Sequence, residues 1–142
     1  MFKQTVYYAH CMAIYDTQQE REDVGRLRSM GFRVVNPNSF RHKSKVKTMK
    51  KNGKTGSQIM DYFITVVNRC DGLAFRAIPE DFAIPAGVAK EIKAMKKKGG
   101  FILELPTFKH RNYMSIASTS NYTRRIKCQS TLNKSSTCRK RS

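Results

Sequence analysis

Short apolar segments alternate with amphipathic helical patterns along the chain, and this order restricts the fold more than any other feature. Strand patterns cover residues 3–10, 32–36, 72–78 and 101–105, and helical patterns begin at residues 17, 57 and 85. A helix between two strands favours parallel pairing through a right-handed crossover. The order predicts an α/β fold, a three-layer sandwich with a four- or five-stranded, mostly parallel sheet.

Local signals mark where several of these elements begin and end. Thr17 and Glu20 have the spacing of a capping box, and Gly31 follows that helix as a stop. Pro85 suits the first position of a helix, and the lysines and glycines of residues 96–100 suit a helix end. The boundaries therefore agree with the strand and helix order.

The formal charge of +18 is unevenly distributed. All ten acidic residues lie between Asp16 and Glu104, whereas residues 41–54 form a basic run and residues 107–142 are basic without any acid. Such an imbalance favours a polyanionic partner, namely nucleic acid, a nucleotide or an acidic protein surface. The alternative is a solvated loop and tail whose charge only keeps the protein in solution.

The length of 142 residues suits one domain with its own core. We expect this domain to cover residues 1–106, with residues 41–56 as a basic loop. Residues 107–142 are expected to form a basic C-terminal extension, a short helix followed by a tail. The sequence has no apolar run of the roughly 18 residues that span a membrane and no signal-peptide pattern at its N-terminus. We therefore expect a cytoplasmic protein without a membrane partner.

The cysteines are scattered along the chain as Cys11, Cys70, Cys128 and Cys138, without a C-x-x-C pair. A zinc site requires clustered cysteine and histidine ligands, and the adjacent pair His10 and Cys11 has no second half. We expect reduced thiols, no metal site and no cofactor.

The segment Ile84–Glu91 indicates a site more directly than any other part of the chain. It follows a strand pattern and a turn-rich loop, begins a helix, and places Glu91 near the start of that helix. A helix N-terminus presents unpaired N–H groups and positive potential, which hold an anion or keep a carboxylate ionised. Glu91 is therefore the first candidate for chemistry. The alternative is a surface acid paired with neighbouring lysines.

Ligands of an open parallel sheet bind beyond the carboxyl ends of its strands. His10, Asn38 and Arg76 follow such strand ends, so the topology brings them towards Glu91. His10 is a candidate for ligand contact or for a structural hydrogen bond, and Arg76 binds phosphate or projects into solvent. Asn38 contacts the ligand or serves only the turn after Pro37.

Four segments carry a resemblance to a known family: residues 7–12 (Tyr-Tyr-Ala-His-Cys-Met), 31–37 (Gly-Phe-Arg-Val-Val-Asn-Pro), 70–75 (Cys-Asp-Gly-Leu-Ala-Phe) and 85–91 (Pro-Ala-Gly-Val-Ala-Lys-Glu). Over about residues 4–106 the chain resembles the nucleoside 2-deoxyribosyltransferase-like proteins, which include deoxynucleotide N-hydrolases. The resemblance implies a flavodoxin-like sandwich that binds a nucleoside or nucleotide. In that family a glutamate attacks the anomeric carbon, expels the base and forms a covalent glycosyl intermediate. Its members commonly share sites across a dimer, which implies a homo-oligomer.

The resemblance also assigns roles to individual residues. Glu91 matches the nucleophile, and a carboxylate suits attack on an oxocarbenium-like centre. His10 and Cys11 stand where the family has Gly-Pro, and Pro85 stands where it has an orienting aspartate. We expect catalytic roles for Glu91 and His10. Substrate contacts are expected from Tyr8, Cys11, Met12, Asn38, Asp61, Arg76, Pro85, Ala86 and Gly87.

The sequence leaves three functions open. The first is an enzyme that cleaves or transfers at the N-glycosidic bond, with Glu91 as nucleophile. The second is a non-catalytic nucleic-acid-binding or assembly protein that uses residues 41–54 and 107–142, whose affinity would fall with salt. The third is a sensor that binds a nucleotide signal in the same pocket without turnover.

Overall fold

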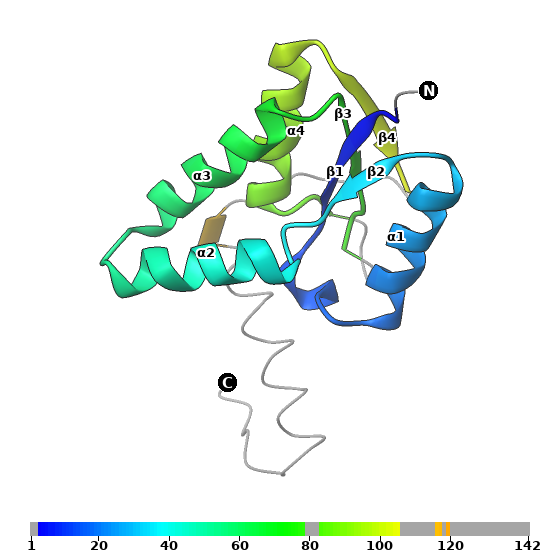
Figure 1. The fold of residues 1–142 in the computed structure, drawn as a ribbon. Coiled ribbons are helices and arrows are strands. Elements are labelled where there is room, and N and C mark those ends of the chain that lie inside the picture. Colours follow the sequence, from blue (N-terminus) through cyan, green and yellow to red (C-terminus); the bar gives the residue numbers. More distant parts are fainter. Residues whose placement is uncertain (1–2, 79–82, 106–115, 118, 120–142) are drawn as a thin grey trace.

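The computed structural model describes residues 3–78, 83–105, 116–117 and 119 (Figure 1). The elements follow one another as β1 (Thr5–Ala9), a short 3-10 helix η1 (Met12–Ile14), α1 (Gln18–Ser29), β2 (Arg33–Val35), α2 (Phe40–Lys51), α3 (Gly56–Asn68), β3 (Gly72–Phe75), α4 (Ala86–Lys98) and β4 (Phe101–Glu104). Each predicted strand segment contains a strand, and the predicted helices begin within one residue of the expected positions.

The described strands form one parallel, four-stranded sheet with the order β2-β1-β3-β4. β1 is central, and its Tyr7 lies opposite Val35 of β2 and Leu73 of β3. Each connection between successive strands contains at least one helix, as parallel pairing requires. The predicted α/β fold with a parallel sheet is confirmed.

Helices cover both faces of the sheet and complete three layers (Figure 1). α3 and α4 lie together on one face, and α1 lies on the other. Side chains alternate along a strand, so β1 directs Tyr7 and Tyr8 to opposite faces. Tyr7 joins the core beneath α3 and α4, and Tyr8 joins the core beneath α1. Both tyrosines are fully buried, so each hydroxyl needs a partner inside the protein.

The basic segment expected as a loop at residues 41–56 is largely a helix, because α2 extends from Phe40 to Lys51. The segment has no glycine or proline before Gly53, and lysine, arginine and methionine favour helices. His42, Val46 and Met49 give α2 a buried or half-buried stripe at helical spacing. This stripe is short and lies within a densely charged segment, which is why the sequence suggested a loop. The expectation of a loop was wrong.

Most of the predicted C-terminal extension lies outside the described residues. Residues 116, 117 and 119 are described there, and they are helical. Within the described part of the chain, no helix is both long and apolar enough to cross a membrane.

Candidate functional site

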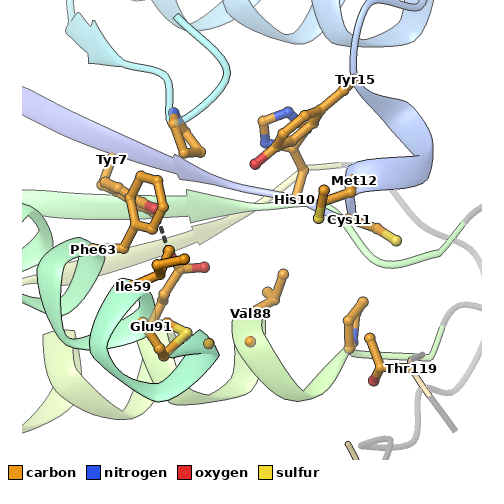
Figure 2. A pocket seen from close by; sticks show the side chains of 15 residues that line it. Tyr7, His10, Cys11, Met12, Tyr15, Ile59, Phe63, Val88, Glu91 and Thr119 are labelled. Carbon is orange, nitrogen blue, oxygen red and sulfur yellow. Dashed lines mark hydrogen bonds between the residues drawn. The ribbon is translucent and has the colours of Figure 1, made fainter. Parts of the chain in front are cut away.

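A pocket of about 240 Å³ opens beyond the carboxyl end of β1, between η1 and the first turns of α3 and α4 (Figure 2). Open parallel sheets favour this position for ligands. The lining residues are Tyr7, His10, Cys11, Met12, Tyr15, Pro37, Gly56, Ile59, Met60, Phe63, Pro85, Gly87, Val88, Glu91 and Thr119.

Glu91 brings a carboxylate to this pocket from the second turn of α4. The residue is only 6% exposed, and the Tyr7 hydroxyl donates a hydrogen bond to its Oε2 (Figure 2). Burial raises the pKa of Glu91 to about 8, although the hydrogen bond from Tyr7 opposes the shift. Among the described residues, none donates a hydrogen bond to the second oxygen, Oε1. One carboxylate oxygen is therefore available to a ligand.

Two tyrosine hydroxyls in the pocket are held in their neutral form. Burial, and then the charge of Glu91, raise the pKa of Tyr7 well above its ordinary value. The same two causes raise the pKa of Tyr15, which follows η1. Both hydroxyls keep their protons at neutral pH, so each can donate a hydrogen bond.

Apolar side chains form much of the remaining wall. They include Met12, Ile59, Met60, Phe63 and Val88, contributed by η1, α3 and α4. Met12 is 55% exposed, which places it at the mouth of the pocket. An apolar wall with a few converging polar groups is the usual composition of a small-molecule site.

Thr119 brings part of the C-terminal extension to the pocket. Its Oγ1 accepts a hydrogen bond of 3.0 Å from the backbone N–H of Ala86, in the first turn of α4. The N-cap residue of α4 is Pro85, which has no side-chain oxygen, so Thr119 serves in place of a local cap. Residues beyond the predicted 1–106 domain therefore contribute to this site.

His10 also lines the pocket, and both of its ring nitrogens have partners. Nδ1 lies 3.0 Å from the backbone oxygen of Tyr8, which can only accept, and Nε2 lies 2.7 Å from Oε2 of Glu20. The ring stacks on Tyr8, with centroids 3.8 Å apart and planes 6° from parallel. A proton-transfer role for His10 would therefore require its hydrogen bond with Glu20 to break.

Glu20 connects His10 to a polar network on the side of α1. Its amide N–H donates to Oγ1 of Thr17 at 3.2 Å, so Thr17 caps α1 as predicted. Its carboxylate accepts from Asn38 Nδ2 at 3.0 Å and from the Asp16 amide at 3.2 Å. Burial alone would raise the pKa of Glu20, but the hydrogen bonds with His10 and Asn38 outweigh burial and lower it.

Arg76 lies in a second polar cluster beneath α1, formed around Asp23. Its Nε and Nη2 donate to the two carboxylate oxygens of Asp23 at 2.6 and 2.8 Å. The Tyr8 hydroxyl donates to the same carboxylate at 2.5 Å. Asp23 is 1% exposed, so this bidentate pair is an internal structural contact.

The structure brings part of the predicted site together. Glu91, His10, Cys11, Met12, Pro85 and Gly87 line the pocket, whereas Tyr8, Asn38, Asp61, Arg76 and Ala86 are not among its lining residues. Asp61 lies instead in a shallow groove between α3 and α4. The topology placed the strand ends at one edge correctly. It did not determine which way each side chain points, and for this reason Tyr8, Asn38 and Arg76 lie near this edge without lining the pocket.

The sequence reasoning did not single out Tyr7, Tyr15, Phe63 or Thr119. A signal existed for Tyr7, because two adjacent tyrosines in a buried strand must each find a polar partner on opposite faces. Phe63 packs against the core from α3, but its place in a pocket depends on how the helices pack. No local pattern indicates that Thr119 contacts the start of α4.

Among the described residues, no group of three or more histidine, cysteine or acidic side chains is placed to hold a metal ion. Cys11 and Cys70 are buried, and no disulfide joins these two described cysteines to each other. No protein-family model, no curated protein and no solved structure matches the chain.

Proposed function

We propose that the chain binds a nucleoside or nucleotide in this pocket and cleaves or transfers it at the N-glycosidic bond. The observation that carries the proposal is the carboxylate of Glu91. One of its oxygens is held by the Tyr7 hydroxyl, and the other is available beside an apolar wall. Glycosyl transfer through a covalent intermediate requires one oriented carboxylate of this kind.

In the proposed reaction, Oε1 of Glu91 attacks the anomeric carbon of the sugar. A C–O bond forms as the C–N bond breaks, and the base leaves with the bonding electron pair and takes up a proton from solvent. Water or a second base then attacks the same carbon and releases the carboxylate. The first acceptor completes hydrolysis, and the second completes transfer.

The burial of Glu91 supports this chemistry in electrostatic terms. The described residues that line the pocket include no lysine or arginine, so the ionised carboxylate has no cationic partner among them. Burial therefore disfavours its charge, as the pKa of about 8 indicates. In the transition state, positive charge develops on the sugar and interacts favourably with the carboxylate. Because this interaction is absent before the reaction, it lowers the activation barrier.

The apolar wall suits the base of such a substrate. Met12, Ile59, Phe63 and Val88 present carbon and sulfur atoms around the carboxylate, and a planar base buries apolar surface against such atoms. The neutral hydroxyl of Tyr15 is a donor that could orient the base or the sugar.

The test is a screen of nucleosides and nucleotides in which chromatography detects the released base. Base release by the natural chain and its loss in Glu91→Gln are expected, and Glu22→Gln on the exposed side of α1 is the matched control. Circular dichroism verifies that both variants fold. Binding by calorimetry without release would favour the nucleotide sensor. No binding of any nucleoside or nucleotide would overturn the proposal.

A further inference from the structure

One side of α2 carries a row of positively charged side chains along the helix. Residues that are three, four or seven positions apart in a helix share a face, so Phe40, Lys43, Lys47, Lys50 and Lys51 lie along one side. We call this side the cationic face of α2. All of its residues are exposed, and α2 contains no acid.

The opposite side of α2 holds the helix to the protein. His42 is buried there, and its Nδ1 lies 2.7 Å from the Tyr62 hydroxyl of α3. Burial, and then the charge of Arg41, lower the pKa of His42, so the ring is neutral and shares this hydrogen bond with the tyrosine hydroxyl. Val46 and Met49 are half-buried on the same side. α2 projects with α3 from the end of the sheet (Figure 1), and this attachment directs the cationic face outward.

Few acids neutralise this face. Nζ of Lys43 lies 3.4 Å from Oδ1 of Asp16, and both side chains are at least half exposed, at 50% and 71%. An exposed pair of this kind contributes little and exchanges readily for another anion. The structure records no ion pair for Lys47, Lys50 or Lys51 among the described residues. Their charges are therefore available to an external anion.

The exposed ring of Phe40 indicates which class of polyanion this face is suited to bind. It is 85% exposed at the first position of α2, on the same face as the lysines. An exposed aromatic ring beside a row of cations is the composition that binds single-stranded nucleic acid, where bases stack and phosphates pair. A membrane surface would require a continuous apolar face, but Val46 and Met49 are partly covered on the other side of α2.

We propose that the cationic face of α2 binds single-stranded nucleic acid, with phosphates on the lysines and one base stacked on Phe40. Lys43, Lys47 and Lys51 follow one another at intervals of roughly 6 Å along the helix axis. That interval is comparable to the separation of successive phosphates in an extended strand. The proposal goes beyond the nucleoside chemistry of the pocket and does not depend on it.

The test measures the binding of a fluorescent 20-nucleotide oligothymidylate to the full chain by anisotropy, across a series of salt concentrations. Lys47→Gln/Lys50→Gln/Lys51→Gln is compared with Lys93→Gln/Lys96→Gln/Lys97→Gln on α4, which removes the same charge from exposed positions. The α2 variant should bind about tenfold more weakly or worse. The slope of log affinity against log salt should fall by about two, because each single-strand phosphate contact contributes about 0.7.

A second comparison tests the stacking. Phe40→Ala should weaken binding of the oligothymidylate by about fivefold to a hundredfold and leave binding of heparin, a polyanion without bases, unchanged. Equal losses in the α2 and α4 variants would overturn the proposal, because net charge alone would then explain binding. It would also be overturned by an absence of binding, or by a Phe40→Ala variant that binds the oligonucleotide like the natural chain.

Discussion

The Tyr7 hydroxyl donates a hydrogen bond to Oε2 of Glu91 and joins the central strand to α4 across 84 positions of sequence. Tyr7 is fully buried and Glu91 nearly so. The contact fixes one carboxylate oxygen and leaves the other facing the pocket.

Tyr7→Phe should lower the rate of base release tenfold to a hundredfold at neutral pH. The variant removes the hydrogen bond that opposes the rise in the pKa of Glu91, and a hydrogen bond to a charged group contributes about 1.5–3 kcal/mol. The pH profile should move to higher pH, because the carboxylate must ionise before it attacks. The matched control is Tyr62→Phe, whose hydroxyl binds His42 instead. An unchanged pH profile in Tyr7→Phe would contradict the assigned role.

Glu91→Gln should stabilise the protein increasingly as pH rises from 5 to 8. The pKa of Glu91 is about 8 in the folded protein and about 4.3 in an unfolded chain. Between these values the folded state holds a proton that the unfolded state has lost, so the stability of the natural chain falls as pH rises. The gain for the variant should reach a few kcal/mol at pH 8. Urea unfolding at each pH measures it, and a gain independent of pH would refute the raised pKa.

Glu20→Gln should have the opposite dependence on pH. The pKa of Glu20 is lowered in the folded protein, so its contribution to stability is present above its unfolded pKa and is lost as pH falls through the folded one. We expect the variant to be less stable than the natural chain near pH 7, with the difference shrinking below about pH 4. Acid unfolding followed by circular dichroism measures this. A constant difference down to pH 2 would argue against the network.

Arg76→Met should destabilise the fold without weakening nucleoside binding. The change leaves the carboxylate of Asp23, which is 1% exposed, without its cation, and breaking a buried ion pair costs about 3–5 kcal/mol. Arg76 is not among the lining residues of the pocket, so the dissociation constant should not change. Arg33→Met, at an exposed position of β2, is the control. Weaker binding with unchanged stability would make Arg76 a ligand contact after all.

The sheet could be predicted from the sequence because strand and helix periodicities differ and each element has clear ends. Gly31 and Gly99, with φ of 92° and 86°, adopt left-handed conformations that glycine tolerates best, so these stops were reliable. α2 could not be predicted in the same way. Its stripe of His42, Val46 and Met49 is short and partly exposed. The helical spacing of these residues was therefore less evident in the sequence than the run of basic residues around them.

The candidate site was predictable at the level of backbone position but not of side-chain direction. Glu91 is buried on the same side of α4 as Val88, Ile92 and Met95, which have the spacing of one helix face. Tyr8 and Arg76 also lie near the expected edge, but strand alternation and the carboxylate of Asp23 draw them beneath α1. Asp23 belongs to α1, and no local spacing in the sequence predicts that it pairs with Tyr8 and Arg76.

The hydrogen bond from Ala86 to Thr119 has a practical consequence for handling this protein. The compact α/β layers end near residue 105, and a truncation there would look natural to anyone preparing a smaller fragment for crystals or NMR. Such a fragment would lose Thr119, which lines the pocket and is the partner of an amide at the start of α4. An inactive fragment would then report on the missing lining residue, and any ligand screen should begin from the longer polypeptide.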